Sequence, residues 1–329
     1  MARTTGTKRR NTDQSMDLGQ VTDVFAAIEE NVSSVVTGKV GVIRLALVAL
    51  LAEGHILVED VPGVGKTLLA RALARSIDCS VRRVQFTPDL LPSDVTGVTV
   101  YSPDTGQFEF RPGPVFANIV LGDEINRAGP KTQSAMLESM EERTVTIDGV
   151  THELAVPFMV MATQNPIELE GTYPLPEAQR DRFMLRLAIG YPGAEAELAM
   201  LRVHGGDDPM TALDAVTDAA TVAEMIAVVR GLHVADSVQQ YIVSLCRSSR
   251  EHPDLELGAS PRASLAMLRA ARALAALSGR DHVLPDDVKA MAPHLLPHRL
   301  ILSPDALLAG RTADQVVGDL LADVPAPTR

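Results

Sequence analysis

The stretch Asp60-Val61-Pro62-Gly63-Val64-Gly65-Lys66-Thr67 decides the fold. It follows a short apolar segment, residues 55–59, that is typical of a strand, and it precedes residues 66–76, which have helical periodicity. A strand, a glycine-rich turn and a helix in this order form a P-loop, in which backbone N–H groups at the helix start cradle phosphate. Lys66 is then expected to reach the β- and γ-phosphates of a nucleotide, and Thr67 to ligate Mg²⁺.

One position of this loop departs from the strict pattern, which has glycine where Asp60 stands. A carboxylate is repelled by phosphate, so we expect Asp60 to point out of the cradle. The backbone of Gly63, Val64 and Gly65 remains as the predicted nucleotide contact.

A second motif, Ile119-Val120-Leu121-Gly122-Asp123-Glu124, places two acids at the carboxyl end of an apolar strand. Ligands of parallel sheets bind at that end. We expect Asp123 to hold Mg²⁺ through water, and Glu124 to orient and polarise the attacking water. Asn165 follows another apolar strand, residues 158–162, and can help to place that water beside the γ-phosphate. The two motifs together predict ATP hydrolysis.

The remaining sequence indicates an α/β core followed by helices. Short apolar strands alternate with helices, which predicts a parallel sheet covered on both faces. Two hairpins interrupt this rhythm, at residues 98–110 and 144–154, and the second turns at Asp148-Gly149. After Pro192 the chain predicts helices punctuated by prolines. The expected organisation is a disordered polar tail at 1–17, an α/β core at 18–191 and a helical domain at 192–329.

Composition excludes several classes of function. The chain has 329 residues, of which 46% are hydrophobic and 22% charged, as in ordinary globular domains. Lys and Arg number 30 against 42 Asp and Glu, a net charge of −12, and only 3% of residues are aromatic. Nucleic-acid binding needs a basic surface and base stacking needs aromatic side chains, so we expect no nucleic-acid partner.

No targeting, membrane or metal segment is expected either. The most apolar run, residues 40–52, contains Arg44 and is shorter than the ~20 residues of a spanning helix. No apolar segment follows the basic residues of the tail, and the two cysteines are far apart, which predicts a reducing, cytoplasmic location. His294 and His298 have the i, i+4 spacing of metal ligands, but Pro297 between them breaks the helix, so no structural metal is predicted.

Long stretches of the chain resemble the MoxR family of AAA+ ATPases, from about residue 17 onward. The stretches that carry the resemblance are residues 83–97 (RVQFTPDLLPSDVTG), 108–114, 123–142 and 162–166 (ATQNP). The resemblance implies a sheet of order 5-1-4-3-2, a helix-2 insert and a pre-sensor hairpin at the two hairpins, an all-helical lid domain and a homo-hexameric ring.

The resemblance also implies roles for single residues. Asn165 corresponds to sensor 1, and Arg182 to the arginine finger that is offered to the neighbouring subunit. Arg180 lies close by, so the choice between Arg180 and Arg182 as the finger stays open. Arg262 corresponds to the sensor 2 arginine of the lid and is expected to contact the nucleotide.

Four functions compete for this chain. The first is a chaperone-like ATPase that remodels or activates a partner protein, for which the resemblance suggests a client with a von Willebrand factor A domain. The second is a chelatase-type motor subunit for metal insertion into a tetrapyrrole. The third, a nucleic-acid motor, is disfavoured by charge and composition, and the fourth, a nucleotide-gated scaffold, by the complete set of catalytic residues. The expected cofactors are ATP and Mg²⁺.

Overall fold

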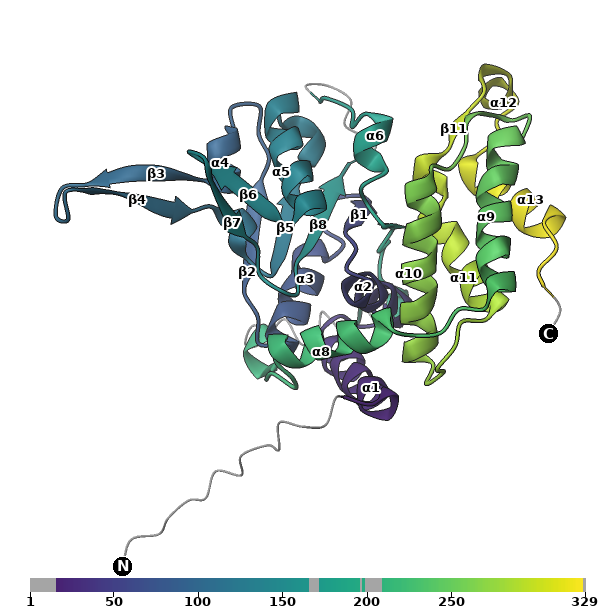
Figure 1. Ribbon diagram of the computed structural model, residues 1–329, viewed down its shortest axis with the longest axis horizontal. Coiled ribbons are helices and arrows are strands. Elements are labelled where there is room, and N and C mark those ends of the chain that lie inside the picture. The colour runs from purple at the N-terminus through teal and green to yellow at the C-terminus, as the bar shows by residue number, and fades with distance from the viewer. Residues whose placement is uncertain (1–15, 166–171, 196, 199–208, 328–329) are drawn as a thin grey trace, which may run out of the picture.

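A five-stranded parallel sheet forms the centre of the amino-terminal part of the molecule (Figure 1). The computed structural model describes residues 16–165, 172–195, 197–198 and 209–327. The strands lie in the order β2-β5-β8-β1-β9, and neighbouring strands pair in parallel. Numbered along the chain and read from β9, this is the order 5-1-4-3-2, which confirms the prediction. The strands are β1 Ile56–Glu59, β2 Val81–Gln85, β5 Ile119–Asp123, β8 Met159–Gln164 and β9 Leu185–Leu187.

Helices cover both faces of this sheet. Along β5, Ile119 and Leu121 pack in one apolar cluster with α1, α2 and α3, whereas Val120 packs in a second cluster with α5. Successive strand residues point to opposite faces, so a strand that is covered twice has to be apolar throughout. The four helices are α1 Leu18–Val35, α2 Val40–Leu51, α3 Lys66–Ser76 and α5 Pro130–Glu142.

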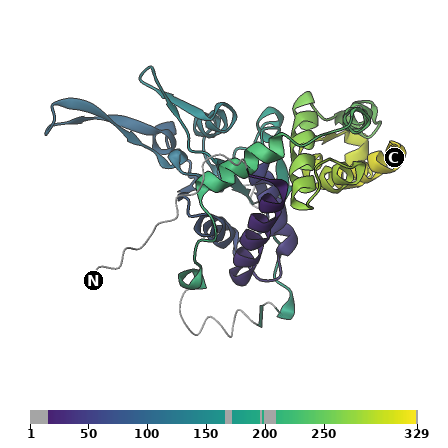
Figure 2. The same ribbon diagram turned by 60° about the horizontal axis from the view of Figure 1, so that its bottom comes forward.

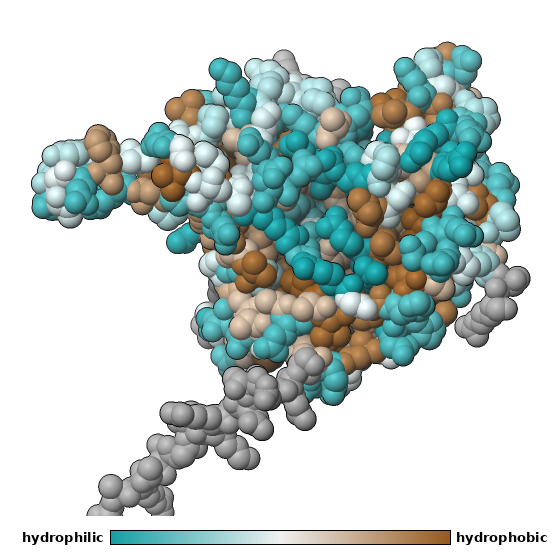
Figure 3. All heavy atoms as spheres, viewed as in Figure 1, coloured by the Kyte–Doolittle hydropathy of each residue, from teal (hydrophilic) through white to brown (hydrophobic). Residues whose placement is uncertain are grey.

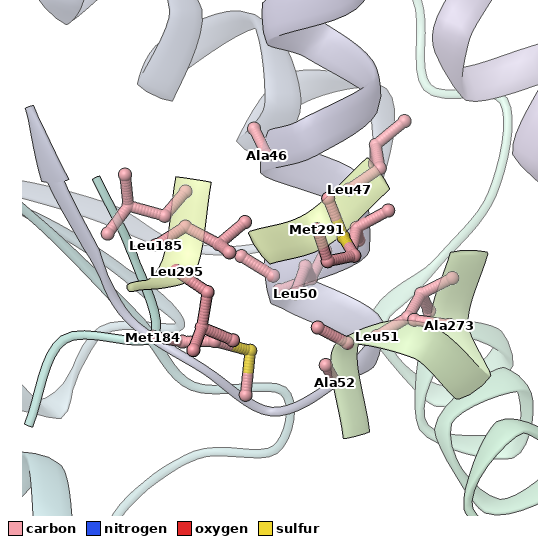
Figure 4. Packing of buried hydrophobic residues seen from close by; sticks show 14 of the residues in the cluster. Ala46, Leu47, Leu50, Leu51, Ala52, Met184, Leu185, Ala273, Met291 and Leu295 are labelled. Atoms are coloured by element: carbon pink, nitrogen blue, oxygen red, sulfur yellow. The ribbon is translucent and has the colours of Figure 1, made fainter. Parts of the chain in front are cut away.

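The second helix, α2, joins the core to the carboxyl-terminal helices. Seven of its twelve residues are buried. Figure 4 shows Leu47, Leu50 and Leu51 of α2 close to Met291 and Ala273, which belong to that second part. The two parts therefore share one continuous apolar core.

Both predicted hairpins are present and project from the core on the same side (Figures 1 and 2). The longer pairs β3 Gly97–Ser102 with β4 Gln107–Pro112, and the shorter pairs β6 Thr144–Ile147 with β7 Val150–Glu153. The shorter one turns at Asp148 and Gly149, both with positive φ (51° and 79°), as a two-residue hairpin turn requires. Phe110 of the longer hairpin stacks on His152 of the shorter, with ring centroids 4.2 Å apart, so the two hairpins are in contact.

The carboxyl-terminal part is mainly helical. It contains α8 Ala219–Arg230, α9 Asp236–Glu251, α10 Pro261–Leu277, α11 Pro285–Leu295, α12 Pro304–Leu308 and α13 Ala313–Asp323. The expectation of an all-helical lid is wrong in one detail, because β10 Leu255–Leu257 pairs with β11 Ile301–Leu302 in an antiparallel ribbon. Strands of two or three residues are too short to give an alternating pattern, so the sequence could not reveal them. The short elements elsewhere are α4 Pro92–Thr96 and α6 Glu177–Arg180.

The helix that carries His294 ends before His298. Helix α11 ends at Leu295, and His298 lies in the following 3-10 turn with its Nε2 3.0 Å from the backbone oxygen of Phe183. Among the described residues, no group of three His, Cys, Asp or Glu side chains could hold a metal ion. In the same part of the chain, no helix has both the length and the apolar character needed to span a membrane.

Candidate active site

The glycine-rich loop between β1 and α3 has the backbone that a phosphate cradle needs. Gly63 and Gly65 have φ values of +85° and +93°, which residues with a Cβ adopt only at a cost. Gly65 caps α3, so the N–H groups of the first helical turn are directed into the loop. The strand, loop and helix therefore form the predicted P-loop.

The carboxylate of Asp60 is held by two backbone N–H groups and does not line the cavity over the loop, which explains why an acid is tolerated there. Its Oδ1 accepts from the backbone N–H of Val61 (2.8 Å), and its Oδ2 from that of Gly190 (2.6 Å). The backbone oxygen of Asp60 accepts from Lys66 Nζ at 2.7 Å. Burial lowers the pKa of Lys66, and the carboxylates of Asp60, Asp123 and Glu124 oppose that shift.

A cavity of about 440 Å³ lies above the carboxyl ends of β1, β5 and β8. Parallel pairing puts these ends side by side: Glu59 of β1 lies opposite Gln164 of β8, and Gln85 of β2 opposite Asp123 of β5. The cavity thus unites seven predicted site residues, which come from three separate segments: Gly63, Gly65, Lys66, Thr67, Asp123, Glu124 and Asn165. Val64 lies in the loop but does not line the cavity.

Both acids of the second motif are held by neighbouring side chains. Asp123 is only 8% exposed, and its Oδ2 accepts from Arg83 Nε at 2.5 Å. Glu124 Oε2 accepts from Gln85 Nε2 (2.8 Å) and from Arg127 Nη1 (3.0 Å). The two carboxylates therefore have fixed positions at the edge of the cavity.

The backbone of Glu124 lies in the left-handed region, with φ +58°. This conformation costs a residue other than glycine about 1–3 kcal/mol. A hydrogen bond from the Glu124 N–H to Thr163 Oγ1 (2.9 Å) holds it, and Thr163 also contacts Asp123 Oδ1 (3.3 Å). A strained residue that is held in this way aims its carboxylate into the cavity that Lys66 lines.

Arg182 and Arg262 do not lie in this cavity. They line a second cavity, of about 640 Å³, beside the amino-terminal ends of β1 and β9, where α10 faces the core. Glu141 of α5 pairs with Arg182 (Nε to Oε2, 3.0 Å) and also with Arg262. Behind them Asp181 pairs with the buried Arg299 (2.9 Å), whose pKa burial lowers to about 10 while Asp181 opposes the shift. Arg180 does not line the second cavity.

Comparison with known proteins agrees with this geometry. Residues 55–185 match the family described as "ATPase family associated with various cellular activities (AAA)", and residues 247–320 match the AAA lid domain. YeaC of Bacillus subtilis is 51% identical over 300 residues, covering 91% of this chain and 94% of YeaC. The chaperone MoxR1 of Mycobacterium tuberculosis is 42% identical over 305 residues, covering 90% of this chain and 80% of MoxR1. The chain belongs to the MoxR family of AAA+ ATPases.

A solved structure of a Cytophaga hutchinsonii protein shares the architecture of this MoxR-family chain. It has 38% sequence identity and a TM-score of 0.89, and the match covers 94% of this chain and 97% of the other. Similarity to a chelatase is more distant: a magnesium-chelatase subunit of Arabidopsis thaliana, ChlI-1, is 28% identical over 192 residues, which is 44% of its length. The comparisons therefore favour the chaperone-like branch over the chelatase alternative.

Four polar residues of the P-loop cavity were not predicted from the sequence, and one of them is Thr163 of β8. Arg71 of α3 and Arg83 and Gln85 of β2 also line it. Residues 81–85 form an edge strand that is largely exposed, where polar side chains are ordinary, so nothing in the pattern singles out Arg83 or Gln85. Only the pairing of β2 with β5 brings them to the two acids.

Proposed function

We propose that this MoxR-family protein binds and hydrolyses Mg-ATP in the P-loop cavity and uses the energy to remodel a client protein. The observation that carries the proposal is the single cavity that joins Lys66, Thr67, Asp123, Glu124 and Asn165. An ammonium, a hydroxyl, two carboxylates and an amide at one helix start are the groups that phosphoryl transfer requires. Oxygen ligands suit Mg²⁺, so the donor set fits that ion.

Each of these residues has a defined task in the proposal. Lys66 and the loop N–H groups bind the β- and γ-phosphates, while Thr67 and Asp123 hold Mg²⁺, which when bound neutralises phosphate charge. Glu124 accepts a hydrogen bond from the attacking water and polarises it, and Asn165 fixes the position of that water. In-line attack on the γ-phosphorus then releases ADP and phosphate.

The two arginines that the nucleotide cavity lacks are supplied by a neighbouring copy. Arg182 and Arg262 line a cavity beside the amino-terminal edge of the sheet, whereas the P-loop lies at the carboxyl edge, so neither arginine reaches the chain's own phosphates. In a ring of identical subunits, one subunit's amino-terminal edge can face the next subunit's P-loop. We therefore assign both arginines to the neighbour's nucleotide, in a hexameric ring, with Arg182 rather than Arg180 as the finger, because Arg182 opens onto the cavity.

The client contacts the two projecting hairpins in this proposal. Tyr101 and Phe108 lie side by side on the longer hairpin, with ring centroids 5.4 Å apart, and Phe108 is 73% exposed. Aromatic side chains of this kind are common anchors in protein interfaces. The family resemblance suggests a cytoplasmic client with a von Willebrand factor A domain.

Three variants test the hydrolytic assignment. Lys66→Ala should lose nucleotide binding, whereas Glu124→Gln should bind ATP but turn it over at least a hundredfold more slowly. Glu256→Gln, an exposed acid on β10, is the matched control and should behave as the unaltered chain. Full turnover by Glu124→Gln would refute the role of Glu124.

The client is tested with the same Glu124→Gln chain. It should stall with ATP bound, so a pull-down from the source lysate with Mg-ATP should retain the client. Recovery of a stoichiometric protein with a von Willebrand factor A domain would support the chaperone assignment. Recovery of a tetrapyrrole-binding subunit instead would contradict it.

A further inference from the structure

The second cavity is lined by more arginine side chains than the two assigned above to a neighbour's nucleotide, Arg182 and Arg262. Beyond Arg182 and Arg262, five further arginines line it. Arg299 is paired with Asp181, and the other four are Arg143 after α5, Arg230 at the end of α8, and Arg269 and Arg272 on α10. Residues 262, 265, 269 and 272 have the spacing of one helix face, so α10 presents its arginines to the cavity as a row. Figure 3 shows the band of hydrophilic side chains between the core and the carboxyl-terminal helices.

One carboxylate, that of Glu53, is hydrogen-bonded within the cluster of Arg143, Arg230, Arg269 and Arg272. Glu53, before β1, accepts hydrogen bonds from Arg143 and from Arg230. Burial raises the pKa of Glu53, but the two arginines outweigh burial and lower it, so Glu53 is charged. The guanidinium groups of Arg143, Arg230, Arg269 and Arg272 and the carboxylate of Glu53 leave a local charge of +3, in a chain whose net charge is −12.

Two of the three arginines of α10, Arg269 and Arg272, have no acidic partner within 4.0 Å among the described residues. In the same part of the chain, the buried Nε of Arg272 has no hydrogen-bond partner. Burial lowers the pKa of Arg269, and repulsion by Arg143 and Arg230 adds to that shift against the attraction of Glu53. A buried donor without a partner, such as Arg272 Nε, destabilises the structure, and a bound acceptor would remove that cost.

We propose that Glu53, Arg143, Arg230, Arg269 and Arg272 form a second anion site that binds a multiply charged oxyanion of the phosphate class. A phosphate carries about two negative charges near neutral pH and offers at least three acceptor oxygens, which matches a surplus of three better than one carboxylate does. The cavity volume of about 640 Å³ accommodates such a group. Because Arg269 and Arg272 belong to α10 whereas Arg143 belongs to the core, the bound anion clamps these two parts together.

This site is distinct from the P-loop and does not rest on ATP hydrolysis. The experiment uses the full chain with Lys66→Ala, so that the P-loop does not take up the probe, and inorganic pyrophosphate as the probe at constant ionic strength. Calorimetric titration should show one saturable site. Arg269→Gln with Arg272→Gln should weaken it at least tenfold, whereas the control Arg247→Gln, an exposed arginine of α9, should leave it unchanged.

Further variants separate this site from the finger arginines and from misfolding. Arg182→Gln with Arg262→Gln should keep the pyrophosphate affinity, and its loss there would overturn the proposal by placing the probe on the finger pair. Arg269→Lys with Arg272→Lys should bind more tightly than the Gln pair, because charge is retained without the guanidinium fork. No saturable binding, or equal binding by the Gln pair, would overturn the proposal. Loss of ring assembly in the Gln pair without pyrophosphate binding would assign the arginines to a contact between copies instead.

Discussion

Glu141→Gln should allow the ring to form its active interfaces at a lower protein concentration. In the isolated chain Glu141 holds both Arg182 and Arg262, and these side chains are between 28% and 40% exposed. Both arginines have to leave Glu141 before they can contact a neighbour's phosphates. The two ion pairs therefore oppose assembly.

The size of this effect follows from the exposure of the pairs. A partly exposed ion pair contributes about 0.5 kcal/mol, so two contribute about 1 kcal/mol per interface. That energy corresponds to a change of about fivefold in the association constant. The glutamine keeps the shape of the side chain and removes its charge.

The assay is ATP turnover over a range of protein concentrations that spans assembly. For Glu141→Gln, the concentration that gives half-maximal turnover should fall about fivefold, while turnover at saturation stays the same. Glu138→Gln, an exposed acid on the same helix, is the control and should shift neither value. A lower plateau, or a half-maximal concentration that rises, would refute the reasoning and show that Glu141 itself takes part in hydrolysis.

Three other perturbations follow from the structure. Gly122→Ala should destabilise the fold by about 1–3 kcal/mol, because the added Cβ would lie 2.9 Å from the Phe86 ring, and chemical denaturation measures this. Arg83→Gln should tighten Mg²⁺ binding up to about fivefold in a fluorescent-nucleotide titration, since it frees Asp123 from an exposed cation; weaker binding would show that Arg83 contacts the phosphates. Burial lowers the pKa of His55 to about 4, below its unfolded value, so stability that is present near neutral pH is lost as the pH falls. From pH 7 to pH 5 this loss should be about 2 kcal/mol, and His55→Gln should reduce it; an equal loss in that variant would exclude His55 as the cause.

Much of the fold could be predicted because the local sequence patterns agree with the burial and backbone conformation that the tertiary structure requires. The strands of the sheet are buried on both faces, so their continuous apolar composition predicts a parallel sheet. Gly63 and Gly65 stand where the backbone has positive φ, which the glycine-rich loop pattern also predicts. The ribbon of β10 and β11 could not be predicted, because its strands are two and three residues long and pair over a separation of more than 40 residues.

The site was predictable where it depends on sequence neighbours, and unpredictable where it depends on strand pairing. Lys66 and Thr67 follow from the loop, and Asp123 and Glu124 from the end of one strand. The contacts of Arg83 and Gln85 with those acids arise only because β2 pairs with β5. The position of Arg262 depends on how the carboxyl-terminal helices sit against the core, which no local pattern encodes.

The central claim is that each active site is completed by a neighbouring copy, and mixing two inactive chains tests it most directly. Lys66→Ala lacks the P-loop lysine but keeps its arginines, and Arg182→Ala lacks the finger but keeps its P-loop. Each should be inactive alone, and the mixture should regain ATP turnover, because Lys66→Ala subunits supply Arg182 to intact P-loops. A mixture that assembles into rings yet stays inactive, or an Arg182→Ala chain that is fully active alone, would contradict the account.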